Sequence, residues 1–397
     1  MTLPPPPDSF GSQPPNGGGV PPWGGPGGQP PYSGGPQQGQ PYGPPQGQLG
    51  GQPQWGPQQQ WAGGPPPPPR RGGKGKGMLV GLALVAVIAV SVVATVLVLR
   101  PDSGGNGSGP TSANADSEFA SANDTGPANI ITEDPTCDAW GRIARDYVAK
   151  AEAAKWGDRD PQIPATQWTQ EQHTMYETVG KALTEAVNFA ANLEKQTPHR
   201  AMRELYGQFR VYSQLVIDAI PSYSPNSDTL SSVSLSAMSG LSNICGAIDY
   251  GSIQSLAPLI SEPNLPSQPT SVNHPSQPFM ETENSVCGEW ITSADSYRQA
   301  TRAWEAISAR IPASEWTPEQ RSIYDATAHV MADYADKMEQ LGRQSKNAIL
   351  EDFSVLGAQY KRAYVVAIPN YSSSDNYVSQ SAIYLANTVY WACKAIP

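Results

Sequence analysis

Few side chains in this sequence have the types and spacing that a catalytic or metal site requires. The four histidines, His173, His199, His274 and His329, are scattered along the chain. None of them lies near a cysteine at the short spacing of zinc ligands. The sequence also lacks HExxH, GxSxG, SxxK, a P-loop and a GxGxxG in a strand–helix context. We therefore expect no catalytic residue, no metal site and no cofactor.

One group of residues could bind an anion. His199, Arg203, Tyr206 and Arg210 recur at the spacing of one helix face, and Arg200 stands beside the first of them. Cations near a helix N-terminus attract phosphate or carboxylate groups. This pattern predicts a patch for an envelope anion. The simpler interpretation, which we favour, is an exposed face balanced by nearby Asp and Glu.

The chain is organised by an uncharged apolar run, residues 78–99. At about 1.5 Å per residue the run is long enough to cross a hydrocarbon core of roughly 30 Å. Four basic residues precede it: Arg70, Arg71, Lys74 and Lys76. Only Arg100 follows it directly, so the bias in charge predicts a cytoplasmic N-terminus. A cleaved signal peptide is the alternative, but the run is too long and begins too far from Met1.

This topology places the larger part of the chain outside the cell. After residue 100 the sequence has 20 Lys and Arg against 34 Asp and Glu, a balance of −14. We expect a single-pass protein, integral to the plasma membrane, whose C-terminal domain is extracytoplasmic. Nucleic-acid binding is not expected, because the basic residues of the N-terminal part are confined to the membrane flank.

The segments on either side of the span have the composition of unfolded chain. Residues 1–77 are rich in Pro, Gly and Gln and predict a disordered cytoplasmic tail. The tail could bind a cytoplasmic proline-recognising module, although a solvated tether is the simpler interpretation. Residues 100–135, rich in Ser, Gly and Asn, predict a flexible linker. Gly77 and Gly81 form a GxxxG pair, so a homo-oligomer remains open.

An internal repeat fills the rest of the chain. Residues 163–176 match 311–324, and residues 220–223 match 368–371. The copies run over 136–250 and 286–397, and a Pro/Ser-rich joint at 251–285 links them. Each copy has four segments in which apolar residues alternate at three- and four-residue spacing. The sequence therefore predicts an all-α fold with two tandem helical bundles of about four helices each.

The repeated motif IPAxxWTxEQ predicts the start of a helix in each copy. Thr169 and Thr317 occupy the N-cap position, and Gln172 and Gln320 follow three residues later. This spacing is that of the capping box. We interpret the motif as structural, because each of its polar positions has a capping role.

The cysteines indicate how each bundle is closed. All four lie on the predicted exterior side, where an even number suggests disulfides. Cys137 and Cys245 bracket the first copy, and Cys287 and Cys393 bracket the second. In an up-down-up-down bundle these two ends lie together. We therefore predict the pairs Cys137–Cys245 and Cys287–Cys393.

The assembled pattern is similar to a known group of proteins. The tail, the single span, the linker and the order Cys…IPAxxWTxEQ…TPHRxMRELY…IPxY resemble uncharacterised proline-rich single-pass membrane proteins of mycobacteria and related actinobacteria. The second copy departs from this pattern at TPHRxMRELY, so any site there would belong to the first copy alone. The resemblance implies the topology and an envelope location, and it supplies no catalytic residue.

These observations lead to one leading function and two alternatives. We expect a membrane-anchored, non-enzymatic cell-envelope protein whose tandem ectodomain binds a protein or envelope partner. The first alternative is a structural tether or self-associating scaffold that acts through the proline-rich tail and the span. An extracytoplasmic enzyme comes third.

Overall fold

The computed structural model describes residues 117–267 and 277–396, and every regular element in those two ranges is a helix. The predicted tail, the predicted span and the first part of the predicted linker lie outside the described residues. None of the described helices is long and apolar enough to cross a membrane. The all-α class is confirmed for the described part of the chain, and the span at residues 78–99 stays a prediction.

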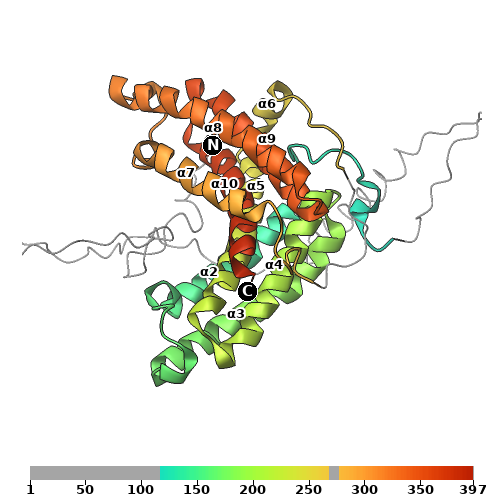
Figure 1. The fold of residues 1–397 in the computed structure, drawn as a ribbon, viewed down its shortest axis with the longest axis vertical. Coiled ribbons are helices and arrows are strands. Elements are labelled where there is room, and N and C mark those ends of the chain that lie inside the picture. The colour runs from blue at the N-terminus through green and yellow to red at the C-terminus, as the bar shows by residue number, and fades with distance from the viewer. Residues whose placement is uncertain (1–116, 268–276, 397) are drawn as a thin grey trace, which may run out of the picture. The chain divides into compact units, whose positions relative to one another are not determined.

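Each copy of the repeat folds into four long helices (Figure 1). The helices of the first copy are α2 (Cys137–Ala153), α3 (Gln170–Gln196), α4 (Arg200–Ala219) and α5 (Asp228–Asp249). Those of the second copy are α7 (Cys287–Glu305), α8 (Pro318–Gln344), α9 (Ala348–Ala367) and α10 (Asn376–Ala395). The connections contain the short helix α6 (Ser252–Leu256) and 3-10 turns such as η1 (Ala120–Asn123). The apolar spacing therefore predicted the order of the long helices correctly.

Both predicted capping boxes are present. The Thr169 side chain accepts a hydrogen bond from the backbone N of Gln172 at 3.3 Å, and the Gln172 side chain accepts one from the backbone N of Thr169 at 2.8 Å. Thr317 and Gln320 make the same two bonds, at 3.2 and 2.9 Å. Each box satisfies two of the backbone donors that the start of a helix leaves unpaired.

A stacked Trp–Tyr pair packs at the same end of each copy. Trp168 stacks on Tyr176 with ring centroids 3.8 Å apart, and Trp316 stacks on Tyr324 at 3.7 Å. Each indole N–H donates to the carbonyl oxygen of the isoleucine five residues earlier, at 2.9 Å. The polar atom of each ring is thus paired while its apolar faces are packed.

Each copy carries the disulfide that the repeat predicts. The pairs are Cys137–Cys245 and Cys287–Cys393, with Cα–Cα distances of 5.1 and 5.4 Å. Both distances lie in the usual range for a disulfide. In each case the bond joins the first residue of the first helix to the end region of the fourth.

The two copies share one hydrophobic core, and the described residues belong to one compact unit. The fourth helices, α5 and α10, lie side by side where the copies meet (Figure 1). Gly246 faces the ring of Tyr377, and a Cβ at position 246 would lie 2.4 Å from a ring atom. Tyr250 stacks on the same ring with centroids 5.1 Å apart. A glycine is therefore required where these two helices approach.

The segments that lead into the two copies are packed rather than solvated. Ile131, within the predicted flexible linker, is 2% exposed, and its carbonyl oxygen accepts from the hydroxyl of Tyr360 on α9 at 3.2 Å. Phe279, within the predicted joint, packs edge-to-face against Tyr212 of α4 and Phe353 of α9. Composition predicts a flexible linker at the first place and a Pro/Ser-rich joint at the second. The difference arises because single buried apolar side chains hold each segment against the helices.

Candidate functional site

The five predicted anion-binding residues lie on α4 or at its N-cap. Helix α3 ends before Pro198, which lacks a backbone N–H, and α4 begins with Arg200 after the extended residue His199. Three of the five side chains are buried: Arg200, Arg203 and Tyr206 are 2%, 4% and 0% exposed. The favoured interpretation, an exposed face beside the apolar one, is therefore wrong for these three residues. In the structure, groups of the preceding segment and of the second copy contact them.

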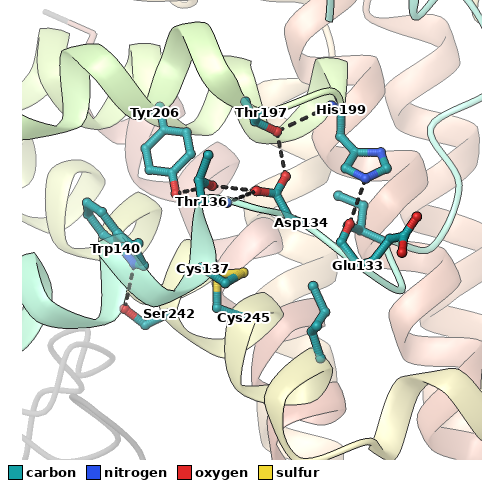
Figure 2. The surroundings of a disulfide bond; sticks show 12 residues. Glu133, Asp134, Thr136, Cys137, Trp140, Thr197, His199, Tyr206, Ser242 and Cys245 are labelled. Atoms are coloured by element: carbon teal, nitrogen blue, oxygen red, sulfur yellow. Dashed lines mark hydrogen bonds between the residues drawn. A yellow bond between two sulfur atoms is a disulfide. The ribbon is translucent and has the colours of Figure 1, made fainter. Parts of the chain in front are cut away.

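A buried carboxylate holds the segment before α2 against the start of α4. Asp134 accepts hydrogen bonds from the backbone N and the hydroxyl of Thr136, at 2.8 and 2.5 Å, and from the hydroxyl of Thr197 at 2.5 Å (Figure 2). Since the hydroxyl proton of Thr136 goes to Asp134, Tyr206 must donate to Thr136 over 2.9 Å. A chain of hydrogen bonds therefore links α4 to the residues directly before Cys137.

His199 binds the same segment through its ring. Its Nε2 lies 2.8 Å from the carbonyl oxygen of Glu133 (Figure 2). A carbonyl oxygen can only accept, so Nε2 carries a proton and donates it. The backbone N of His199 donates to the hydroxyl of Thr197 at 3.2 Å. We call residues 117–136, which these contacts hold, the N-terminal arm.

A deeply buried ion pair connects the two copies. Arg200 of α4 donates from Nε and Nη2 to the two carboxylate oxygens of Asp352 on α9, at 2.7 and 2.9 Å, and both side chains are 2% exposed. Its Nη1 donates to the carbonyl oxygen of Asp124 in the N-terminal arm at 2.7 Å. Burial lowers the pKa of Arg200, but the bond to Asp352 and its charge outweigh burial and raise the pKa overall. Arg200 therefore stays charged, and the carboxylate of Asp352 in the same chain neutralises that charge.

The other two arginines also contact groups of the chain. Nη1 of Arg203 donates to the hydroxyl of Ser121 in the N-terminal arm at 3.1 Å. Burial lowers the pKa of Arg203, and the charge of Glu204 offsets part of that effect. Arg210 forms an ion pair with Glu194 of α3, whose side chain is 1% exposed. Each cation of the predicted patch thus has an acceptor within the protein, and anion binding there stays a prediction.

These contacts form one polar cluster that joins α4, α9 and the N-terminal arm, and we call it the clasp. Its members are Ser121, Asp124, Asp134, Thr136, Thr197, His199, Arg200, Arg203, Tyr206 and Asp352. An incoming anion would have to displace a group of the chain that these cations already bind, which for Arg200 is the carboxylate of Asp352. Within the described ranges, no group of three or more His, Cys, Asp or Glu side chains could hold a metal ion. The geometry of the clasp supports a structural role.

The divergence between the two copies has a structural explanation. In the register of the repeat, Arg203 of the first copy is replaced by Glu351 in the second. Glu351 is 2% exposed and accepts from the backbone N of Ser267 at 3.0 Å and from Nη1 of Arg343 at 3.1 Å. At this position the third helix of the first copy uses a cation, Arg203, to bind the N-terminal arm. The third helix of the second copy uses a carboxylate, Glu351, to bind Ser267 in the joint between the copies.

Sequence reasoning found the cations of the clasp and missed its carboxylates. Asp124 and Asp134 lie in the predicted flexible linker, and Asp352 lies in the other copy. One signal was present: Asp134 and Asn284 each stand three residues before the first cysteine of their copy. Both side chains accept from the backbone N two residues on, at 2.8 and 3.2 Å, which is an Asx-turn. The partner of Asp352 lies 152 residues away and depends on how the copies pack.

Comparison with known proteins places the arm and both copies in one family. Residues 119–397 match a family model described as Mycobacterial ESX-1 associated protein. The chain is similar to an uncharacterized protein of Mycolicibacterium smegmatis (strain MKD8), with 39% identity over 344 residues, covering 85% of this chain and 90% of the relative. No solved structure matches the chain. The mycobacterial resemblance expected from the sequence is confirmed, and its membrane and proline-rich details stay predictions.

Proposed function

Because the chain belongs to the family of mycobacterial ESX-1 associated proteins, we propose that it is a non-enzymatic, membrane-anchored component of the ESX-1 secretion system. In this proposal the helical region, residues 117–397, binds a protein partner. The observation that carries the proposal is the family match over residues 119–397, because it spans the N-terminal arm and both copies of the repeat.

The clasp supports a binding role rather than catalysis. Its histidine and arginines could take part in a reaction, but they donate to carbonyl, hydroxyl or carboxylate oxygens of the chain itself. A catalytic acid, base or nucleophile must instead reach a substrate atom within hydrogen-bond distance. The burial of Arg200, Arg203 and Asp352, and the bonds of the clasp within the chain, suit a rigid scaffold that displays the outer faces of the other helices.

The topology in this proposal has residues 1–77 in the cytoplasm, residues 78–99 in the plasma membrane and the helical region outside. The two disulfides support an oxidising compartment for the helical region. A reporter enzyme that is active only outside the membrane tests this arrangement. Fused to the C-terminus of the full chain in a mycobacterium it should be active, and fused to the N-terminus it should be inactive. The reverse pattern would refute the topology.

Site-specific photo-crosslinking of the full chain tests for the partner. Glu177 on α3 and Asp325 on α8 are exposed and equivalent in the repeat, so they form a matched pair of positions for the crosslinker. We expect a crosslinked product at one or both positions in cells with an intact ESX-1 system, and its loss in cells that lack the system. Products that are identical in the two strains would contradict the proposal.

Deleting residues 1–69 separates partner binding from the scaffold alternative. If the ectodomain binds the partner, the truncated chain keeps its ESX-1-dependent crosslinks. If the protein acts as a scaffold through its tail, the truncated chain loses its clustering in the membrane. Fluorescence microscopy of the two forms measures the second outcome.

A further inference from the structure

The second copy buries a lysine where the first copy has a serine. Lys361 of α9 is 0% exposed, and its Nζ lies 2.9 Å from the hydroxyl of Tyr297 on α7. The equivalent residue of α4, in the register of the repeat, is Ser213, whose hydroxyl lies 2.7 Å from that of Ser234. The first copy folds the same four helices without a cation at this position. The lysine is therefore not required by the helical packing.

The neighbours of this lysine are aromatic. Tyr297 stacks on Tyr334 of α8 with ring centroids 4.2 Å apart, and Nζ of Lys361 lies 4.8 Å from the Tyr297 centroid. In the first copy the equivalent of Tyr334 is Ala186. A phenol hydroxyl and an aromatic face solvate an ammonium group less completely than water does. The charged form of Lys361 is thus the unfavourable one in this site.

The titratable and charged groups around the site belong to four helices. They are Asp295, Tyr297, Arg298 and Glu305 on α7, Tyr334 on α8, Tyr364 on α9 and Tyr390 on α10. Burial raises the pKa of Tyr297 and of Tyr334, so both phenols stay neutral. Burial lowers the pKa of Lys361 from 10.5 to about 7, and the charge of Glu305 offsets part of that effect. Near neutral pH the lysine changes charge while these two phenols do not.

Helix α7 is attached by different means at its two ends. Its first residue, Cys287, forms the disulfide with Cys393. Its second half contacts α9 through Tyr297 and Lys361 and through Trp304, whose ring packs edge-to-face on Tyr364 at 5.9 Å. The covalent end is insensitive to pH, whereas the other end contacts the buried amine of Lys361 on α9.

We infer that Lys361 makes the second half of α7 a proton-sensitive element: when the buried amine takes up a proton from solvent, this half of α7 is released from α8 and α9, with the Cys287–Cys393 disulfide as the hinge. This device goes beyond the proposed function and does not depend on which partner the protein binds. Release would expose Tyr297, Tyr334 and the apolar face of α7.

The thermodynamic linkage between protonation of Lys361 and opening of α7 gives the sign and size of the pH effect. The opened state binds the proton more tightly than the closed state, so opening increases as pH falls from 10.5 and levels off below about 7. Between about pH 8.5 and about pH 5.5, these two pKa values give an increase of about thirtyfold in the opening equilibrium.

Hydrogen exchange of the full chain measures this opening. Protection factors, corrected for the intrinsic pH dependence of exchange, should fall by about thirtyfold in residues 297–305 over this pH range. Residues 147–153 of α2 in the same molecule are the internal control, because the equivalent of Lys361 in that copy is Ser213. Their protection should change little.

Two variants test whether the amine of Lys361 causes the pH-dependent loss of protection in α7. Lys361→Met removes the charge and keeps an unbranched side chain one atom shorter, and Lys361→Ser installs the residue of the first copy. Both should abolish the acid-dependent loss of protection in α7. The inference is overturned if α7 and α2 lose protection equally, if α7 is unchanged by pH, or if both variants keep the response of the parent chain.

Discussion

Two buried cations of this protein, Arg200 and Lys361, differ in their partners. Arg200 is paired with both oxygens of Asp352 and with a backbone carbonyl, so its charge is compensated where it is buried. Lys361 has a phenol hydroxyl and an aromatic face. Burial penalises both cations, but only the first has a carboxylate in contact, and this explains why their pKa values move in opposite directions.

The Arg200–Asp352 pair makes a prediction at the scale of one contact. Arg200→Met leaves Asp352 buried without its cation and should lower the free energy of unfolding by about 3–5 kcal/mol. Arg200→Met combined with Asp352→Leu should recover much of the loss, since an apolar pair of similar volume can replace a buried ion pair. Denaturant unfolding of the full chain measures both. Arg142→Met, on the exposed face of α2, is the control, and an equal loss there would contradict the role of the clasp.

At the scale of an element, the helices begin where local sequence signals place them, and they pack where glycine allows close approach. The capping boxes at Thr169 and Thr317 use residues within four positions of each other. The contact of α5 with α10 instead depends on Gly246 meeting a ring from the other copy. The first kind of feature is visible in a short window of sequence, and the second is not.

The two capping boxes should contribute equally to the free energy of unfolding. Thr169→Ala and Thr317→Ala each remove the hydroxyl that accepts from the backbone N three residues on, which should cost about 1 kcal/mol. Thr166→Ala, at an exposed position in the turn before α3, should change stability by less than about 0.5 kcal/mol. Thermal unfolding of the three variants measures these costs. A Thr317→Ala loss several times larger than the Thr169→Ala loss would show that the boxes are not equivalent.

Substituting Gly246 should be costly, whereas substituting a second helical glycine should not. A Cβ at Gly246 would lie 2.4 Å from the Tyr377 ring, so Gly246→Ala should lower stability by about 1–3 kcal/mol through overpacking. A Cβ at Gly288 in α7 would meet nothing within 4 Å. Gly288→Ala should therefore leave stability unchanged or raise it, because alanine is the better helix former. Equal effects in the two variants, measured by denaturant unfolding, would contradict the close packing of α5 and α10.

At the scale of the whole described region, the two copies behave as one structural unit. They share a hydrophobic core, and the N-terminal arm contacts both of them through Arg200 of α4 and Tyr360 of α9. Repeats that bury their apolar faces against each other stabilise one another. A partner that binds either copy would therefore bind a surface whose rigidity depends on both.

This sharing predicts a single unfolding transition. Removing one disulfide, as Cys287→Ser with Cys393→Ser, should lower the melting temperature of the whole helical region rather than of one copy. The two loops have nearly the same sequence separation, 106 and 108 residues. Removing either bond should therefore cost a similar amount, about 4–5 kcal/mol in the chain-entropy description. Calorimetry that resolved two transitions, with only one shifted by the variant, would contradict a shared core.

The sequence by itself determined the helical class, the repeat, the capping boxes and the cysteine pairing. Each of these is encoded in local spacing or in the symmetry between two copies, and needs no knowledge of distant contacts. Only the tertiary structure decided that the copies share a core, that the N-terminal arm is packed, and that Arg200 meets Asp352 while Lys361 meets Tyr297. These contacts join residues far apart in the chain. A lone charged residue looks the same in sequence whether it lies on a solvated face or in a core, and only packing decides what partner it finds.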